Sequence, residues 1–577
     1  MEHLFGKSAY EGIVIGDVYI ENDNEEKNSA DDIPVYDVQS EKERLDTALK
    51  SAVSSLEGLK KGLTGEIAKK DLDIIDAHLL ILKDPEYIKE IKKYIEKELK
   101  RSETAIKSVT EKYLKLFENI DSPIYRQREL DIKDASNRLL DILGSDEENH
   151  RLLDGKILIT KEIYPTELLK IYKEKIALKG IVMEYGGETS HVAILAKALK
   201  IPTLMGVEHI FAHQWNGDII LDTTEGNSCV IIDPDENTLK DYRDKQKEMA
   251  RRIRKINESA NLPAVTQDDE KINLYLNIGD SERHSEDDVD KSTIAGVGLL
   301  RTELIYMKSS EFPSEEKQVK IYTEILKDFS SEQSIVIRTL DIGADKQLSY
   351  FKMHCESNPF LGLRGIRFSL ENKEIFKIQL RAILRMSSKK NIKIMYPMIT
   401  NLDEIDRANG ILEEVKEDLR KENISFDENI EVGIMVEVPS VVLMAEEFAQ
   451  KIDFFSIGSN DLTQYILAAD RLSETVGNMY DSFNPAVFRA IYEIKKAADK
   501  YGKKVSVCGE MAGDPRAIVA LLSMGIKNLS MVETSIPAAK ALIRNLEYKN
   551  LSSVRDKILK CENIDEIKEI LKEKIIY

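Results

Sequence analysis

The sequence predicts a multidomain α/β protein: a small α/β domain, a helical bundle inserted into it, a linker helix and a C-terminal (β/α)8 TIM barrel. The length allows this, because 577 residues are enough for three or four domains of roughly 100–200 residues each. Between about residues 34 and 145 the pattern is helical throughout. From about residue 271 onward, β-rich apolar segments alternate with helical patterns, which is typical of such a barrel.

The small α/β domain is predicted from two stretches, residues 1–22 and 146–233. The first stretch indicates a strand pair, with its clearest apolar run at Gly12–Ile20. The second predicts further strands, at Lys156–Thr160, Ile181–Met183, Thr203–Met205, Ile219–Asp222 and Cys229–Ile232. We therefore expect one domain that the intervening residues split in the sequence.

Residues 23–145 are expected to form the inserted helical bundle. Glu/Lys pairs at i,i+4 spacing recur there, and such pairs support exposed helix faces. Breaks near Gly62–Gly65, Asp84-Pro85 and Asp121–Pro123 divide the stretch into four or five helices. An insertion of this kind suits a docking module, and a purely structural bundle is the equal alternative.

Residues 234–262 predict a linker helix between the small domain and the barrel. The segment Asn237–Asn257 is highly charged and has no strong apolar face, as expected of a helix in solvent. A linker of this kind would allow the small α/β domain to move relative to the barrel.

The barrel is predicted over residues 263–577 from eight strands, each followed by room for a helix. They are Ile272–Ile278, Gly296–Arg301, Ile335–Asp341, Gly362–Phe368, Ile392–Met398, Glu431–Pro439, Phe454–Asp461 and Lys504–Gly509. Polar residues stand where several of them end: Arg301, Arg338, Glu437, Asn460, Asp461 and Cys508. In barrels of this type the carboxyl ends of the strands form the active face.

Composition excludes several classes of protein. The net charge of −20 argues against nucleic-acid binding, which needs a basic face. The longest apolar stretch, around Ala517–Ile526, is too short for membrane insertion, and the N-terminus shows no signal-peptide pattern. The four cysteines are dispersed without a CxxC pair, which favours reduced thiols and a cytoplasmic location.

One histidine stands at a predicted helix start. The pair Gly186-Gly187 gives a turn, Thr189 and Ser190 are good N-caps, and His191 follows in the first helical turn. Free backbone N–H groups and the positive end of the helix dipole suit an anion there, so His191 can accept a phosphoryl group. Taken alone, the local pattern favours a merely packed or solvated histidine.

Acids and arginines at the predicted strand ends point to an anionic substrate. Glu437 and Asp461 are hard oxygen ligands suited to Mg²⁺, with solvated acids as the alternative. The guanidinium groups of Arg301, Arg338 and Arg471 can each bind phosphate or carboxylate bidentately, with a structural salt bridge as the alternative. Together they favour a small, highly anionic, metal-bound substrate.

Cys508 ends the last of the predicted strands, where a buried structural thiol is the default interpretation. In a site that forms an enolate, this thiol can act as a general acid. Two nucleotide patterns fail: Gly296–Arg301 has arginine in place of the third glycine of a dinucleotide fingerprint, and the sequence has no GxxxxGK[ST] loop.

Taken together, the motifs resemble those of enzyme I of the bacterial sugar phosphotransferase system, the phosphoenolpyruvate–protein phosphotransferase family. The resemblance covers almost the whole chain in order and length. It is carried by Gly186–His191, Gly298–Glu303, Arg338–Gly343, Asn358–Gly362, Ile434–Glu437, Phe455–Tyr465 and Cys508–Ala512.

The resemblance implies a role for each candidate residue. His191 would be phosphorylated through Nε2, and Cys508 would protonate the pyruvate enolate. Phosphoenolpyruvate would contact Arg301, Arg338, Arg471, Asn460 and Asp461, and Mg²⁺ would bind Glu437 and Asp461. The bundle would dock the phosphocarrier protein HPr, and the barrel would form a homodimer.

Some positions depart from the family's pattern. Glu188 replaces a basic residue often found before Thr-Ser-His, which removes one possible partner for the phosphate. Ala9–Gly12 lacks the usual Ser-Pro-Gly, Ala344 replaces a usual glycine, and Thr223-Thr224 stands where Asp/Asn-Gly is usual. These departures lie outside the predicted barrel site, so the expected chemistry is retained.

Two rival functions are considered. Pyruvate phosphate dikinases and phosphoenolpyruvate synthases share the histidine and barrel motifs, but they need a large ATP-binding region, and the residues before His191 are mostly helical. A phospho-sensor without catalysis would bind phosphoenolpyruvate and regulate partners. Retention of the acid, arginine, thiol and histidine positions argues against it.

Overall fold

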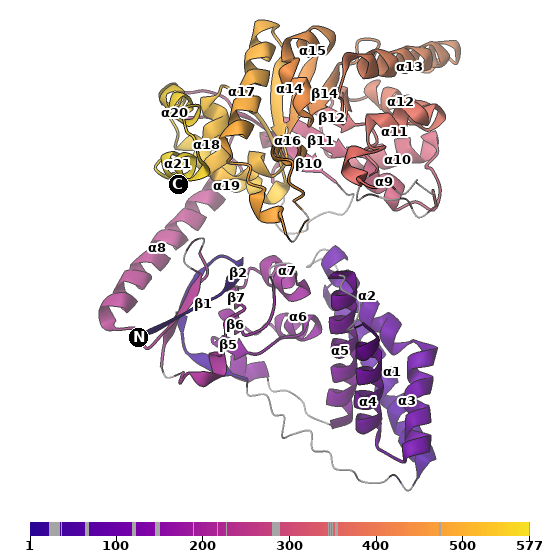
Figure 1. The fold of residues 1–577 in the computed structure, drawn as a ribbon, viewed down its shortest axis with the longest axis vertical. Helices are drawn as coiled ribbons and strands as arrows, with labels where there is room; N and C mark the ends of the chain where they lie inside the picture. Colours follow the sequence, from indigo (N-terminus) through magenta and orange to yellow (C-terminus); the bar gives the residue numbers. More distant parts are fainter. Residues whose placement is uncertain are drawn as a thin grey trace. The chain divides into compact units, whose positions relative to one another are not determined.

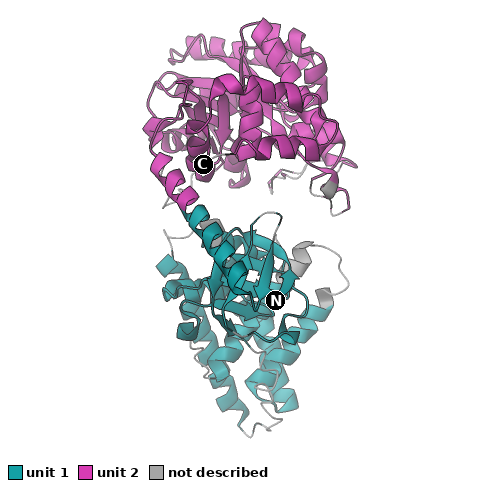
Figure 2. Ribbon diagram, turned by 90° about the vertical axis from the view of Figure 1, so that its left-hand side faces the viewer, with its two compact units in different colours: residues 1–250, 282–286 teal, residues 251–281, 287–577 magenta. Residues whose placement is uncertain are grey.

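The structure is a computed structural model in which the chain divides into two compact units (Figure 2). One is built mainly from Met1–Ala250 and the other from Arg251–Ser281 and Asp287–Tyr577. The structure describes every residue except 22–34, 36, 64–68, 118–122, 145–149, 188–189, 216, 225, 227, 280–288, 344–345, 347, 349, 352–355, 472, 474 and 576–577. Its multidomain α/β fold with a C-terminal parallel barrel confirms the predicted class.

The first unit contains two sheets (Figure 1). Among the described residues, one sheet has four antiparallel strands in the order β1-β9-β8-β3, and the other has five in the order β2-β7-β6-β5-β4. Their bounds are β1 Glu2–Phe5, β2 Lys7–Tyr10, β3 Ile13–Gly16, β4 Val18–Ile20, β5 Ile157–Thr160, β6 Gly180–Met183, β7 Thr203–Met205, β8 Ile219–Asp222 and β9 Cys229–Ile232.

The predicted N-terminal strand pair is wrong, because that stretch forms four short strands shared between the two sheets. Gly6 separates β1 from β2 where a Cβ atom would lie 2.6 Å from the carbonyl oxygen of Met205. Gly12 separates β2 from β3, and a Cβ atom there would lie 2.5 Å from the ring of Pro202. These close approaches let one short segment pass between the sheets.

Side chains alternate between the two faces of each strand, and this unit has three layers: the four-stranded sheet, the five-stranded sheet and the helices. Ile157, Val182 and Leu204 of the five-stranded sheet pack against the four-stranded sheet. The neighbouring side chains Leu158 and Ile181 point to the opposite face and pack in one core with the helices. The same helical core includes α6 Pro165–Lys173 and α7 His191–Ala198.

The inserted stretch forms five helices in the part that the structure describes (Figure 1). They are α1 Val38–Leu63, α2 Lys69–Leu82, α3 Pro85–Glu98, α4 Ser102–Phe117 and α5 Pro123–Gly144. Asp84 caps α3, with its carboxylate accepting from the backbone N–H of Glu86 at 2.8 Å. The break after α3 escaped prediction because Leu99, in the left-handed conformation, ends the helix without a glycine.

The predicted linker helix is present as α8 Glu236–Ser259. Its side chains are largely exposed or half-buried, and Tyr242 is its buried residue. The division between the two compact units falls within this helix, after Ala250. Within the described residues, we find no helix long and apolar enough to cross a membrane.

The second unit is a closed barrel of eight parallel strands within the described residues. They are β10 Asn273–Ile278, β11 Gly296–Arg301, β12 Ser334–Arg338, β13 Ile392–Tyr396, β14 Val432–Val436, β15 Phe454–Gly458, β16 Lys504–Cys508 and β17 Asn528–Met531. The surrounding helices are α9 Glu303–Met307, α10 Glu315–Ile325, α11 Ile366–Glu371, α12 Lys373–Ser387, α13 Leu402–Lys421, α14 Pro439–Leu443, α15 Ala445–Lys451, α16 Ser459–Leu467, α17 Pro485–Lys500, α18 Pro515–Ser523, α19 Ile536–Arg544, α20 Ser552–Ile558 and α21 Ile564–Lys572.

One predicted barrel strand is wrong. The stretch Gly362–Phe368 holds a turn at Gly365, with φ of +62°, and the start of α11. A Cβ atom at Gly365 would lie 2.9 Å from the Cβ atom of Met398, so the chain turns sharply there. The eighth strand is β17, which pairs with β16 and β10 and closes the barrel.

Candidate active site

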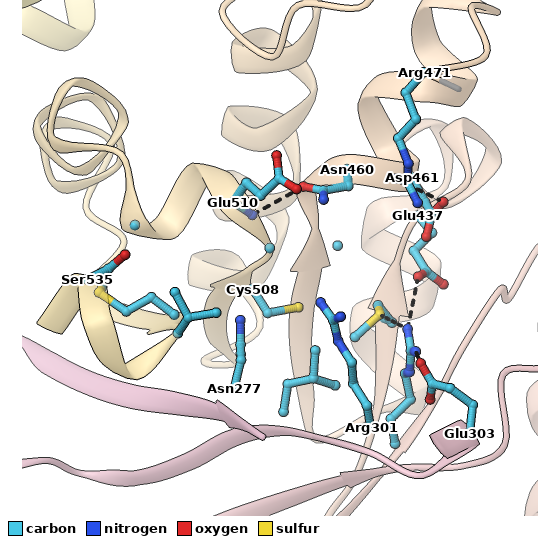
Figure 3. A pocket seen from close by; sticks show the side chains of 18 of the residues that line it. Asn277, Arg301, Glu303, Glu437, Asn460, Asp461, Arg471, Cys508, Glu510 and Ser535 are labelled. Atoms are coloured by element: carbon cyan, nitrogen blue, oxygen red, sulfur yellow. Dashed lines mark hydrogen bonds and ion pairs between the residues drawn. The ribbon is translucent and has the colours of Figure 1, made fainter. Parts of the chain in front are cut away.

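The carboxyl ends of the barrel strands surround a cavity of about 650 Å³ (Figure 3). The barrel residues predicted from the sequence all line it: Arg301, Arg338, Glu437, Asn460, Asp461, Arg471 and Cys508. The structure therefore brings this set together, although the role of each residue stays a prediction.

The alternation of side chains explains why charged residues reach this cavity. Leu299, Val336 and Met435 belong to one apolar cluster inside the barrel. Two residues further along the same strands or just past their ends stand Arg301, Arg338 and Glu437, which therefore face the same way. Apolar residues fill the barrel and charged residues occupy its mouth.

Arg338 is buried at the end of β12 among carboxylates. Its Nη2 atom lies 2.6 Å from Oε1 of Glu303 and 3.1 Å from Oδ2 of Asp341. Its Nη1 atom lies 3.7 Å from Oε1 of Glu437. The salt-bridge alternative is thus realised, and the same ion pairs hold the guanidinium at the cavity.

Arg364 is a cavity residue that the sequence prediction missed. It is buried, with Nε 3.1 Å from Oδ1 of Asp341 and Nη2 3.0 Å from Oδ2 of Asp461. The signal was a single arginine between two glycines, inside the stretch predicted as a strand. Lys346, 3.0 Å from Oδ2 of Asp341, was missed as well.

Glu437 and Asp461 have opposite electrostatic environments. Burial, together with the carboxylates of Asp461 and Asp341, raises the pKa of Glu437 to about 8. Its Oε2 atom accepts a hydrogen bond from the backbone N–H of Met398 at 2.7 Å. Burial alone would raise the pKa of Asp461, but Arg364 lowers it below its ordinary value.

This donor set fits a divalent cation. Burial and the neighbouring carboxylates raise the pKa of Glu437, and a cation between Glu437 and Asp461 would favour the ionised form of both. Among the described residues, no group of three or more Asp, Glu, His or Cys side chains gathers as a complete metal site. Magnesium suits such a place, because it takes one or two carboxylates and completes its shell with water and substrate phosphate.

Three further residues line the cavity: Arg301, Arg471 and Asn460. Arg301 is exposed at the end of β11, and Figure 3 shows its side chain pointing into the cavity. Nη1 of Arg471 lies 3.6 Å from Oδ1 of Asp461. Asn460 and Asp461 stand in the first turn of α16, where free N–H groups favour an anion.

Cys508 is a buried thiol at the end of β16. The hydroxyl of Ser456 donates to its Sγ atom at 3.4 Å, and Sγ lies 3.5 Å from the carbonyl oxygen of Ile457. Burial raises the pKa of the thiol, so it is protonated at neutral pH. A protonated thiol at the cavity can donate a proton to a carbanion.

His191 lies in the first unit, at the start of α7. Ser190 is the N-cap, and its Oγ atom accepts from the backbone N–H of Ala193 at 3.2 Å. The ring is half-buried, with Nδ1 3.8 Å from Oδ1 of Asp131 in α5. Burial lowers the pKa of His191, partly opposed by Asp131, so the ring is neutral at pH 7. A neutral imidazole is a competent nucleophile.

The remaining departures are partly described. Glu188 and Thr189, beside His191, and Ala344 lie outside the described residues. Thr223 donates its hydroxyl to the carbonyl oxygen of Tyr10 at 2.8 Å. The departures at Ala9–Gly12 and at Thr223 therefore contact each other within the first unit.

Three family models together match most of the chain. Models of PEP-utilising enzymes match residues 5–128 as the N-terminal domain, 152–226 as the mobile domain and 254–548 as the PEP-binding domain. Fold and site therefore define a PEP-utilising enzyme, PEP being phosphoenolpyruvate.

Similar proteins narrow the class. The phosphoenolpyruvate-protein phosphotransferase of Priestia megaterium is 39% identical over 541 residues, covering 93% of each chain. That of Bacillus subtilis (strain 168) is 38% identical over 99% of this chain and 100% of its own, and that of Staphylococcus aureus is 36% identical over 98% of each. This chain belongs to the phosphoenolpyruvate-protein phosphotransferase family, which confirms the resemblance to enzyme I.

Proposed function

We propose that this protein takes the phosphoryl group of phosphoenolpyruvate onto His191 and passes it to a histidine of HPr, the first step of sugar phosphotransferase transport. One observation carries the proposal. A single cavity combines arginines, a carboxylate pair and a protonated thiol, while a neutral histidine stands at a helix start on a separate unit.

Binding of phosphoenolpyruvate relies on positive charge that the chain holds in place. Arg338 is fixed by its ion pairs, while Arg301 and Arg471 reach the cavity from its edge. Bidentate contacts from these guanidinium groups neutralise the phosphate and carboxylate. Mg²⁺ held by Glu437 and Asp461 would add Lewis-acid stabilisation of the phosphate oxygens when bound.

Phosphoryl transfer uses Nε2 of His191 as the nucleophile. Its lone pair forms the N–P bond while the P–O bond to the enol oxygen breaks, and the electron pair stays on that oxygen as an enolate. The free N–H groups at the start of α7 then face the phosphoryl oxygens. His191 and the cavity belong to different units, and we assign to the linker helix α8 the movement of the small domain between phosphoenolpyruvate and HPr.

Cys508 completes the first half-reaction. The enolate carbon takes the proton of the Sγ–H group, which gives pyruvate, and the thiolate recovers a proton from solvent. Burial keeps the thiol protonated until a strong carbon base is present beside it.

HPr is proposed to dock on the inserted bundle. The bundle helices α2 and α5 contribute residues to the small cavity that His191 also lines, so a protein bound there comes close to the phosphohistidine. This favours the docking interpretation of the bundle over the purely structural one.

The wider proposal includes three features that the resemblance implies. They are Mg²⁺ as the cofactor, a homodimer formed through the barrel, and a cytoplasmic location with reduced thiols. The described cysteines Cys229, Cys508 and Cys561 are all free.

A label-transfer experiment tests the proposal. The purified protein is incubated with Mg²⁺ and ³²P-labelled phosphoenolpyruvate, with and without purified HPr. We expect label on this chain alone, then on HPr when it is added, with pyruvate released in equal amount. A parallel incubation with γ- or β-labelled ATP, AMP and phosphate should leave the chain unlabelled. Label from ATP, or none from phosphoenolpyruvate, would overturn the proposal.

A further inference from the structure

A second histidine, on helix α2 of the bundle, lines the same small cavity as His191. His78 is 1% exposed. Its Nε2 atom lies 3.6 Å from Oδ1 of Asp131, and its Nδ1 atom lies 3.6 Å from Oδ2 of Asp134. A buried imidazole between two carboxylates from α5 is costly to maintain unless its polar atoms have a use.

The two ring nitrogens of His78 lack a hydrogen-bond partner at normal distance within the described residues. Asp134 is itself occupied, because the hydroxyl of Thr166 donates to its Oδ1 atom at 2.7 Å. Burial raises the pKa of Asp134. His78 is therefore held on one side by a fixed carboxyl group and faces Asp131 on the other.

Asp131 stands between the two histidines. The same Oδ1 atom lies 3.8 Å from Nδ1 of His191 and 3.6 Å from Nε2 of His78. All three side chains line a small cavity of about 50 Å³. The other titratable groups that line it are Asp134, Glu162, Tyr164 and Tyr185. Contacts of this kind are often long in a resting enzyme and shorten in the reactive complex.

We propose that Asp131 and His78 are positioning residues for phosphoryl transfer at His191. Asp131 accepts the Nδ1–H of His191, which leaves Nε2 unprotonated and free to attack. His78 donates its Nε2–H to the same carboxylate and keeps it oriented. This inference rests on the proposed function of His191.

The balance of the step shows what Asp131 contributes. When Nε2 forms the N–P bond and the P–O bond of phosphoenolpyruvate breaks, the proton on Nδ1 stays in place. The ring becomes cationic, and the adjacent carboxylate stabilises that charge, as in other carboxylate–histidine pairs. When the phosphoryl group leaves for the next acceptor, the N–P bond breaks and the ring returns to its neutral form.

The inference also changes the meaning of the inserted bundle. His191 belongs to the small α/β domain, whereas His78 and Asp131 come from α2 and α5. The bundle thus supplies part of the microenvironment of the phosphohistidine as well as a docking surface. Replacing these residues should change the first half-reaction, in which HPr takes no part.

Spectroscopy of the whole chain tests the tautomer directly. The protein has eight histidines, so selective ¹⁵N labelling of their rings gives a tractable spectrum. We expect Nδ1–H for His191 in the unmodified protein. An Nε2–H tautomer in the folded wild type would overturn the inference without any variant.

Variants test the positioning role. Asp131→Asn should reduce the rate of His191 phosphorylation by about 10- to 100-fold, by analogy with the cost of losing a carboxylate that orients a metal-binding histidine. In this variant the ring of His191 should show both neutral tautomers. The acid limb of the pH–rate profile should move to lower pH, because Asp131 raises the pKa of His191. Asp131→Glu should restore part of the rate. Asp141→Asn, an exposed change on the same helix, is the matched control.

The outcomes separate this inference from the proposed function. If wild-type His191 takes no phosphate, the proposed function fails. If it does, and Asp131→Asn matches Asp141→Asn in rate, tautomer and pH profile, the positioning role fails. His78→Gln should reproduce a weaker form of the Asp131→Asn defect, and an unchanged rate would remove His78 from the account.

Discussion

The barrel cavity and the His191 site hold their functional groups in opposite ways. In the barrel, Arg338 and Arg364 are buried and each contacts at least two carboxylates. His191 is half-buried at a helix start, and Asp131 is 3.8 Å away. A site that must bind a small anion gains from fixed charges, whereas a carrier must present its phosphate to two different partners. The difference indicates a division of labour between the two units.

Removing the carrier should have the largest effect. His191→Gln should abolish phosphorylation of the chain and every later transfer, because Nε2 is the sole nucleophile in the proposed step. Incorporation of ³²P from phosphoenolpyruvate measures it. His213→Gln, which removes another histidine of the same unit, is the control and should be labelled normally. Wild-type labelling of His191→Gln would show that another residue carries the phosphoryl group, and it would contradict the division of labour between the two units.

Breaking the fixed network of the barrel should reduce both stability and activity. Arg338→Met removes one buried partner from Glu303 and from Asp341, which keep Lys346 and, for Asp341, Arg364, and we expect a loss of at most about 3–5 kcal/mol of unfolding free energy. Arg301→Met, at an exposed arginine, should impair phosphoenolpyruvate binding with little change in stability. Denaturant unfolding and KM measure the two effects. Equal unfolding midpoints for both variants would contradict the contrast between fixed and exposed arginines.

Loss of the thiol should separate the two products of the first half-reaction. Cys508→Ala should still phosphorylate His191, but pyruvate formation should slow by about 10²- to 10⁴-fold, a usual contribution of a general acid. Rapid quench and a pyruvate assay follow the two products. Cys561→Ala, another buried cysteine in the same unit, should behave as wild type. Unchanged pyruvate release in Cys508→Ala would exclude the thiol as proton donor.

The pH dependence should be the smallest and most specific effect. Burial lowers the pKa of His191 below 6.5, so the neutral nucleophile persists to lower pH than in a solvated histidine. The single-turnover rate of His191 phosphorylation should therefore fall on the acid side with a midpoint below 6.5. A midpoint above 6.5 would show that the ring is stabilised as a cation, as if Asp131 outweighed burial.

The sequence predicts well those elements that carry a long apolar signal. Strands such as β11 and β14 are nearly continuous apolar runs, because parallel barrel strands are covered on both faces. The short strand β17, Asn-Leu-Ser-Met, is half polar and escaped prediction. The polar side chain of Asn528 joins β17 to β16, because its amide donates to the carbonyl oxygen of Val505 at 2.9 Å.

Residues that act across long separations are harder to predict. Charged groups at strand ends are readable because all carboxyl ends of a parallel barrel meet on one face. Arg364 follows no strand, so its position depends on the turn at Gly365. Asp131 and His78 lie on bundle helices, and their place behind His191 depends on how those helices pack against α7. No local pattern contains that packing.

Mapping the phosphate tests the central claim most directly. The full-length protein is mixed with phosphoenolpyruvate and Mg²⁺, digested at alkaline pH and examined by mass spectrometry that preserves acid-labile phosphate. The account predicts one phosphoryl group, on His191. Phosphate on any other residue, or on none while pyruvate is still formed, would contradict it.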